Sequence, residues 1–432
     1  MKTKTILFLT ALFFGAFVNV TKADEANNEK VYTLEECIDL AVENLPELAA
    51  AKSRVKQQEE NLRAANTLKL PRLDAEIKYN RLPESIPQKK RYLGESLNDF
   101  QADVILRQPL YAGGKTEAEV RAARHALDAV NEEYRIALNN SVFNIKTAYV
   151  KLLHALYMLE SKEALLKSTQ WFYGTALDLN RKTKIPREET LLRIEVQLNQ
   201  VRQDVISARQ DYLTAQKTLL GAMGLDTSGD INIAKLPETA PDKDASLKKT
   251  FAQKNPEVLA INNRIKESQA QIQAAKSGYY PEVSALLSYG YEWPGIDAGG
   301  VRWTAGVNMG FSLWNWGQIK AVVKKSMERE HELEANRESL INNLELSLEN
   351  ALLKFKAASA KFEIASGNLE LARRSLKLFE KRYHNTTATS IELLDSQKAF
   401  SETQAAYATA LLEMRIASAE IGKITGGYFE NK

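Results

Sequence analysis

The sequence predicts a mainly helical fold with a smaller β part, built from two similar halves. Three observations support this prediction: long stretches lack both glycine and proline, four shorter segments alternate apolar and polar residues, and the same order of elements occurs twice. The chain has 432 residues, of which 44% are hydrophobic and 26% are charged, so it can bury a core and is not a disordered chain.

Charge and cysteine content exclude several classes of protein. The formal net charge of +3 falls to zero when Lys2, Lys4 and Lys22 are removed with the N-terminal segment described next, so charge gives no reason to expect a nucleic-acid partner. The single cysteine, Cys37, excludes a disulfide framework and a cysteine-built zinc site. A mean hydropathy of −0.35 argues against a helical membrane protein.

Residues 1–23 are expected to be a secretory signal peptide. Lys2 and Lys4 precede an apolar run over residues 6–18, and small residues flank the end of the segment at Thr21 and Ala23. An uncleaved anchor is the alternative, but the run is short for a span that needs about 20 apolar residues. No later apolar run could form a spanning helix, so an exported chain would be soluble or would enter a membrane as a closed β-barrel.

Four long helices are expected, two in each half. Residues 115–173, 318–366 and 368–421 contain neither glycine nor proline, and their apolar residues recur at steps of three and four, as in coiled coils. A shorter helix opens each half, and Thr33 and Glu36 form a capping-box pattern that places Cys37 as a small buried residue. The long helices are predicted at 113–180, 187–220, 317–384 and 390–425.

Four β-strands are expected because the apolar period changes from about 3.6 to 2. Strands of about 10 residues match a tilted bilayer crossing, and one apolar face would then contact lipid. Any one such strand taken alone would favour a soluble core, but four of them behind a signal peptide favour a membrane. The strands are predicted at about 72–82, 100–111, 281–292 and 301–313. The aromatic residues expected at the membrane interfaces are Tyr111, Trp293, Trp303, Trp314 and Trp316.

The two halves align at an offset of about 210 residues, with Pro46 over Pro256 and Pro71 over Pro281. Four strands cannot close a barrel, whereas three chains would supply twelve, which is within the range of membrane barrels. The resulting division is a signal peptide (1–23), a first repeat (24–220), a linker (221–245), a second repeat (246–426) and a tail (427–432).

No motif indicates an enzyme, a cofactor or a metal site. Gly114, Lys115 and Thr116 follow a strand and open a helix, as in a phosphate-binding loop, but Pro109 stands where that motif needs a glycine. The four histidines show no close metal-binding spacing, and no nucleophile motif occurs. An exported nucleotide-dependent enzyme based on this segment is therefore a weak hypothesis.

The two helix-to-helix turns have different charges. The first turn is basic, with Arg181, Lys182, Lys184 and Arg187. In the second, Glu392 and Asp395 are three residues apart and share a helix face, so three chains would form a ring of six carboxylates that favours cations. A capping box of Thr389 and Glu392 is the alternative explanation for Glu392.

These features together resemble the TolC-family outer-membrane efflux proteins over nearly the whole mature chain. The similar motifs are the helix starts at residues 44–48 and 255–258, the strands led by Pro71 and Pro281, and the strand-to-helix segments 108–114 and 311–317. Residues 382–395 look like the family's second periplasmic tip, and Glu392 and Asp395 fall on its two acidic ring positions.

The resemblance implies a homotrimer in the outer membrane: a twelve-stranded barrel with four strands per chain, continued into the periplasm by a long α-helical coiled-coil barrel. It implies a passive exit duct for efflux or type I secretion, opened at its tip by a periplasmic adaptor protein and an inner-membrane RND or ABC transporter. It also implies contact with outer-membrane lipid. The residues then expected at the adaptor-docking tips are Arg181, Lys182, Lys184, Arg187, Arg382, Tyr383, Thr386 and Thr389.

One alternative function stays open from the sequence. A soluble periplasmic scaffold or adaptor would also contain long coiled-coil hairpins, and the alternating segments would then form an ordinary β-domain. The two hypotheses differ in whether the chain needs a membrane.

Overall fold

The computed structural model describes residues 31–81, 98–183, 188–236, 254–293, 300–384 and 387–426. The expected signal peptide (1–23), the linker beyond residue 236 and the tail (427–432) lie outside these residues. So do three of the expected tip residues, Lys184, Arg187 and Thr386.

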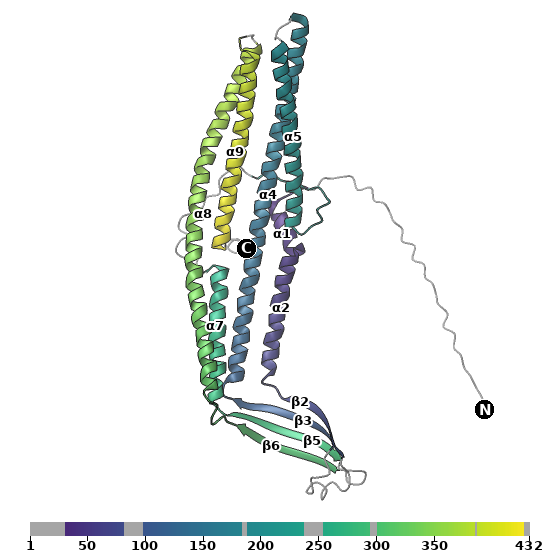
Figure 1. The fold of residues 1–432 in the computed structure, drawn as a ribbon, viewed down its shortest axis with the longest axis vertical. Helices are drawn as coiled ribbons and strands as arrows, with labels where there is room; N and C mark the ends of the chain where they lie inside the picture. Colours follow the sequence, from purple (N-terminus) through teal and green to yellow (C-terminus); the bar gives the residue numbers. More distant parts are fainter. Residues whose placement is uncertain are drawn as a thin grey trace, which may run out of the picture.

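The chain is a long rod of helices with a sheet at one end (Figure 1). Two long helical hairpins form the rod, and the longest helix has 69 residues, which corresponds to about 100 Å at 1.5 Å per residue. The hairpins are α4 (Lys115–Thr183) with α5 (Glu188–Ala222), and α8 (Gln318–His384) with α9 (Ser390–Thr425).

Shorter helices complete each half of the rod. Helix α2 (Pro46–Thr67) packs against α4, while α7 (Pro256–Lys276) packs between α4 and α8, on the side of the rod nearer the sheet (Figure 1). Both begin at a proline, which is favoured at a first helical position because its missing N–H needs no partner there. The Asn255 side chain accepts a hydrogen bond from Glu257 N at 2.8 Å and donates one to Ile424 O at 2.8 Å, which ties the start of α7 to the end of α9.

The sheet has the strand order β2–β3–β5–β6 and is antiparallel throughout. The two outer pairs repeat each other: Leu73 pairs with Leu106 in the first half, and Val283 pairs with Met309 in the second. A bulge interrupts β3 between Pro109 and Tyr111. The strands are β2 (Arg72–Arg81), β3 (Asn98–Ala112), β5 (Glu282–Trp293) and β6 (Gly300–Gly310).

The last strand is shorter than the sequence predicts. Its alternation continues to Leu313, but β6 ends at Gly310, which pairs with Glu282, the first residue of β5. Residues 311–313 therefore have no partner in β5. The equivalent strand β3 continues to Ala112 because β5 pairs with it on its other side, where Ala112 lies opposite Glu282.

The largest apolar core surrounds the middle of α4. Tyr149 is fully buried there, and its hydroxyl donates to Ala234 O at 2.7 Å beside the two-residue strands β1 (Val31–Tyr32) and β4 (Asn232–Ile233). Helix α1 (Leu34–Asn44) begins with the predicted capping box of Thr33 and Glu36, and it buries Cys37 in this core. Burial raises the pKa of the Cys37 thiol to about 11, so this cysteine is a structural residue.

Across the described ranges, no helix is both long enough and apolar enough to cross a membrane.

Candidate functional site

One face of the sheet is apolar and exposed. The strand register places most apolar residues of all four strands on this face, because side chains two apart along a strand share a face and directly paired residues do too. In one row across the sheet, for example, Val104 pairs with Tyr289 and Tyr289 with Trp303. Its exposed members include Leu73, Ile77, Tyr79, Phe100, Val104, Leu287, Tyr289, Tyr291, Val301, Trp303, Val307 and Met309. A contiguous exposed apolar face of this kind marks a surface that contacts a membrane or another protein.

Aromatic residues gather at both ends of the sheet. Trp293 and Trp303 lie towards the end where β5 and β6 are joined, and Tyr291 packs edge-on against Trp293 with ring centroids 5.9 Å apart. Tyr111, Trp314 and Trp316 lie at the end that meets the helices, and all three are exposed. Four of the five aromatic residues predicted for membrane interfaces are therefore at the two ends of the sheet, while Trp303 lies three residues inside β6, opposite Tyr289. This distribution is typical of the aromatic girdles of membrane strands.

The opposite face of the sheet is polar and carries a charged cluster. The Arg302 guanidinium on β6 lies 2.7 Å from an Asp103 carboxylate oxygen on β3 and 3.0 Å from Glu292 on β5. Gly290 on β5 stands between Asp103 and Arg302 in the register, and a Cβ there would overlap the Asp103 carboxylate. The cluster therefore needs glycine at position 290. Sequence reasoning missed it because the ion pair spans 199 residues and depends on the register of three strands.

The ends of the two long hairpins pack against each other at the far end of the rod. Phe172, Ile194 and Leu393, from α4, α5 and α9, are buried together. The Tyr383 ring from α8 lies edge-on to Phe172 with centroids 5.3 Å apart. Tyr383, predicted as a docking residue, is therefore only partly exposed and belongs to this tip core.

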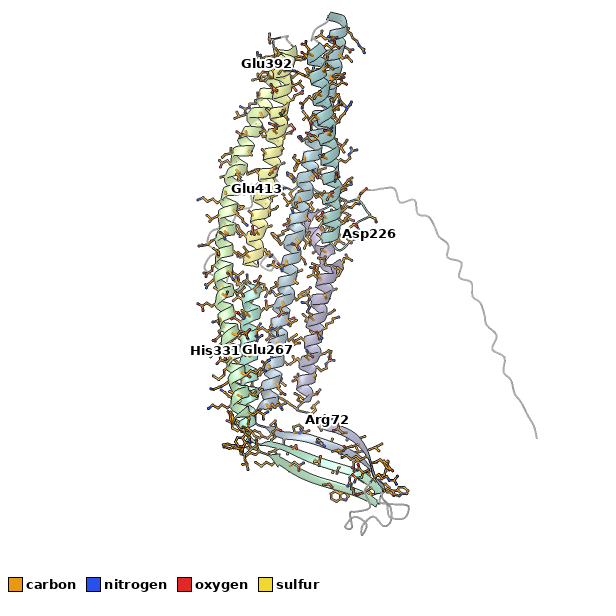
Figure 2. The ribbon with its side chains drawn as sticks, in the orientation of Figure 1. Arg72, Asp226, Glu267, His331, Glu392 and Glu413 are labelled. Atoms are coloured by element: carbon orange, nitrogen blue, oxygen red, sulfur yellow. The ribbon has the colours of Figure 1, made fainter. Side chains whose placement is uncertain are left out.

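Glu392 lies at the start of α9, close to this end of the rod (Figure 2). Thr389 and Glu392 form the predicted capping box: the Thr389 backbone N–H donates to the Glu392 carboxylate at 2.7 Å, and Glu392 N donates to Thr389 Oγ1 at 3.3 Å. The Thr389 backbone N–H and the Thr389 hydroxyl, at 2.9 Å, both donate to the Glu392 carboxylate, and these bonds lower the pKa of Glu392 because they favour its charged form. Asp395 is exposed one turn later and lines the same groove between α8 and α9 as Glu392. Both side chains are therefore exposed carboxylates at the tip.

The basic tip residues differ in their local roles. Arg181 and Lys182 are exposed in the last turn of α4. Arg382 stabilises the second turn: its side chain donates to Thr387 O at 3.1 Å, and its carbonyl accepts from Thr387 N at 2.8 Å. Its guanidinium also lies over the Phe379 ring, 5.6 Å from the centroid. Arg382 thus organises the turn, whereas Arg181, which lies 3.9 Å from Asp178, and Lys182 are exposed at the end of α4.

The segment that resembled a phosphate-binding loop is a corner between a strand and a helix. Gly113 and Gly114 have φ values of +61° and +82°, and a Cβ on Gly113 would lie 2.8 Å from both Ser277 O and Tyr280 Cβ. Both glycines are therefore required by the backbone and its packing. Within the described part of the chain, no group of three His, Cys, Asp or Glu side chains could hold a metal ion.

A family model for outer membrane efflux proteins matches residues 37–225 and 248–427, which is most of the chain. The chain belongs to the outer membrane efflux protein family. This is a family of channels and not of enzymes, and its members lie in the outer membrane and extend into the periplasm. The predicted family and the predicted location in the outer membrane are thereby confirmed.

Two characterised relatives are similar in sequence. The chain is 21% identical over 403 residues to the outer membrane protein OprJ of Pseudomonas aeruginosa, covering 91% of this chain and 84% of OprJ. It is 26% identical over 212 residues to the outer membrane protein TolC of Vibrio cholerae. That second match covers 46% of this chain and 47% of TolC, about half of each.

Solved channel structures share the fold. The Campylobacter jejuni CmeC outer membrane channel superimposes with a TM-score of 0.78 at 17% identity, over 91% of this chain and 85% of CmeC. The open state of the Neisseria gonorrhoeae MtrE outer membrane channel gives a TM-score of 0.77 at 18% identity, over 91% of this chain and 88% of MtrE. These likenesses confirm the predicted fold class of long helices with a small sheet.

Proposed function

We propose that this chain forms a homotrimeric exit duct in the outer membrane, serving a tripartite efflux or type I secretion system. The observation that carries the proposal is the exposed apolar face of the sheet, with aromatic residues at both ends, at the base of helices about 100 Å long. A soluble protein would cover such a face, whereas a barrel strand presents it to lipid.

The sheet supports an oligomeric barrel because both of its edges are open within the chain. Strand β2 pairs only with β3, and β6 pairs only with β5, among the described residues. Open edges offer unpaired backbone groups that are costly in a membrane, and closure between chains removes them. Three copies would supply twelve strands, with the Arg302 cluster facing the lumen and the apolar face in contact with lipid.

Helix α8 supports association of the rods as well. Exposed apolar residues form two groups along it, and within a group they recur at steps of seven. This spacing places them on one side of a coiled-coil helix. They are Leu346 and Leu353, and then Ile364, Leu371 and Leu378. This stripe would pack against a neighbouring copy and continue the coiled-coil barrel from chain to chain.

At the tip, Glu392 and Asp395 of three chains would supply six carboxylates around the axis. Such a ring would attract cations and form the constriction of the resting duct. Opening would require the packed hairpins to rearrange, and in this proposal an inner-membrane RND or ABC transporter supplies the energy through a periplasmic adaptor. The duct itself makes or breaks no bond.

Conductance in planar lipid bilayers tests the proposal. The purified chain should form cation-favouring pores of low open probability, and Glu392→Gln combined with Asp395→Asn should remove the selectivity. A matched control is Glu188→Gln with Glu189→Gln, which neutralises two exposed carboxylates in the first turn of α5 at the other tip. The absence of any conductance would contradict the duct. Fractionation adds a simple check, since a periplasmic scaffold would stay soluble without detergent.

Adaptor docking is proposed at the basic turn between α4 and α5 and at the turn between α8 and α9. Reversing the charges of Arg181, Lys182, Lys184 and Arg187 together should weaken cross-linking to the adaptor and reduce export. Unchanged cross-linking and export would remove the basic turn from the docking surface, and the duct would then need another contact.

A further inference from the structure

The duplication of the chain extends to the two corners where strands turn into long helices. The last residues of β3 and β6 lead to helices that start at equivalent positions, and Gly113 and Gly114 correspond to Trp316 and Gly317. The backbone agrees, since φ is +61° and +82° in the first corner and +52° and +80° in the second. The first helical hydrogen bond is also equivalent: Ala118 N to Gly114 O at 3.1 Å, and Ala321 N to Gly317 O at 2.9 Å.

The first corner packs inside the chain against the second half, at the turn between α7 and β5. Gly113 lies against the turn of residues 277–280, so closely that a Cβ would meet Ser277 O and Tyr280 Cβ. The equivalent turn in the first half is residues 67–70, closed by the same hydrogen bond: Leu70 N donates to Thr67 O at 2.9 Å, as Tyr280 N does to Ser277 O at 2.8 Å.

Within the described chain, the second-half corner has no partner turn that stands to it as residues 277–280 stand to Gly113. The first-half turn, residues 67–70, likewise has no partner corner. Trp316 is 89% exposed, and Leu70 is 58% exposed. Trp316 is also the only non-glycine residue with positive φ in the described ranges. A tryptophan holds this conformation only where its surroundings enforce it, and such residues gather at functional contacts.

We propose that the Trp316 corner of one copy docks on residues 67–70 of the next copy, as the Gly113 corner does on residues 277–280 within the chain, with the wider spacing that the Trp316 side chain requires. The proposal rests on the oligomeric duct described above and specifies its subunit boundary. Both contacts would lie next to equivalent strand pairs. Within the chain β3 lies beside β5, and between chains β6 would lie beside β2 of the next copy.

The sizes of the facing residues are complementary in the two contacts. Within the chain a glycine, Gly113, faces a large residue, Tyr280. Between chains the large residue, Trp316, would face the smaller Leu70. A Cβ at Gly113 would lie 2.8 Å from Ser277 O and Tyr280 Cβ, and Thr67 and Leu70 carry the equivalent atoms, so the Trp316 corner would stand farther from its turn and its side chain would fill the gap. The contact between chains would therefore differ from the one within a chain. This difference would keep the two halves from being confused during assembly.

The correspondence between the two halves also specifies the register between β6 of one copy and β2 of the next. Within the chain, Val104 pairs with Tyr289 and Leu106 with Leu287. Applied to the boundary, these pairs become Val307 with Tyr79, and Met309 with Ile77, of the next copy. All four of these boundary residues are exposed and lie on the apolar face, so this register continues the face without a break. A slip by one residue would turn apolar side chains towards the polar face.

Cysteine cross-linking tests the register. In outer membranes treated with a mild oxidant, Met309→Cys combined with Ile77→Cys should give covalently linked dimers and trimers, because directly opposed Cβ atoms are about 5 Å apart. Met309→Cys with Lys78→Cys is the matched control and should give none, since Lys78 belongs to the polar face. Native Cys37 is fully buried, and the single variants control for it. Linkage of the control pair, or no linkage of either pair in a chain that is trimeric, would overturn the register.

Trp316 is tested by substitution. Trp316→Gly should leave the helical content of the chain unchanged but reduce the trimer that survives mild detergent at least tenfold, whereas Trp316→Phe should retain most of it. Trp303→Ala, at another exposed position on the apolar face of the sheet, should leave the trimer intact. A Trp316→Gly trimer as stable as the unmodified one would overturn the docking. If the unmodified chain is monomeric in membranes, the proposed duct fails as well, which separates the two failures.

Discussion

Helices α4 and α8 are equivalent in the two halves and almost equal in length, at 69 and 67 residues, but the chain covers them very differently. Helix α4 packs against α2, α5, α7 and α9, and it buries Tyr149, Leu152 and Phe172 completely. Helix α8 packs chiefly against α7 and α9, and Leu353 in its middle is 66% exposed. Duplication thus repeated the scaffold, while the apolar pattern made one helix central and left the other with an uncovered flank. That flank fits contact with a neighbouring copy.

The largest expected effect concerns the covered helix. Leu152→Ala should lower the free energy of unfolding by about 2–5 kcal/mol, because it removes a fully buried side chain and leaves a cavity. Leu353→Ala, the same substitution on α8, should leave the folding of the single chain nearly unchanged. Denaturant unfolding of both variants in detergent measures the difference. Equal losses for both would show that α8 is covered within the chain.

The uncovered flank can be tested through assembly. Replacing Leu346, Leu353 and Leu371 by serine should raise the concentration at which oligomers dissociate by tenfold or more, because apolar area would no longer be buried between chains. Sedimentation in detergent measures the dissociation. Lys356→Ser, at an exposed charged position of the same helix, is the control and should have no such effect. An unchanged oligomer in the triple variant would place the neighbour elsewhere.

A smaller effect is expected at the start of α9. Thr389→Ala should destabilise the first turn of this helix by about 1 kcal/mol, since it removes the side-chain cap. The pKa of Glu392 is lowered in the fold, so its contribution is present above the usual glutamate pKa and is lost as pH falls through the lowered value. Amide exchange of residues 390–393 should therefore quicken in Thr389→Ala at neutral pH. Exchange as slow as in the unmodified chain would show that packing alone holds the turn.

The smallest effect concerns His154 on α4. Burial lowers its pKa, although Asp211 opposes the shift, and its ring lies 3.3 Å from Thr409 Oγ1 on α9. Near pH 6 the unfolded chain therefore binds more protons at this residue than the folded chain does. Stability should consequently fall as pH drops below about 6.5. His154→Gln should flatten this dependence between pH 7 and 5. The same slope in both proteins, measured by thermal unfolding, would assign it to other groups.

The elements of the fold could be predicted from local sequence patterns. Alternation located the strands, and both capping boxes, at Thr33 and Thr389, are present in the structure. The end of β6 could not be predicted, because the alternation continues to Leu313 and only the length of its neighbour stops it at Gly310.

Much of the candidate site depends on contacts between distant segments. The pair of Asp103 and Arg302 requires the register of three strands and the space over Gly290. The contact of Phe172 with Tyr383 requires both hairpins to end at the same height. The positive φ of Trp316 carries no local signal, since tryptophan has no preference for it, and only comparison with Gly113 in the duplicated half could have indicated it.

In the proposed duct, several copies of this chain close one channel, and each copy supplies four strands and an uncovered α8. Native mass spectrometry of the complex extracted from outer membranes in mild detergent tests this assembly. We expect a single species of three mature chains. A monomer as the only species, under conditions in which the chain remains folded, would contradict it.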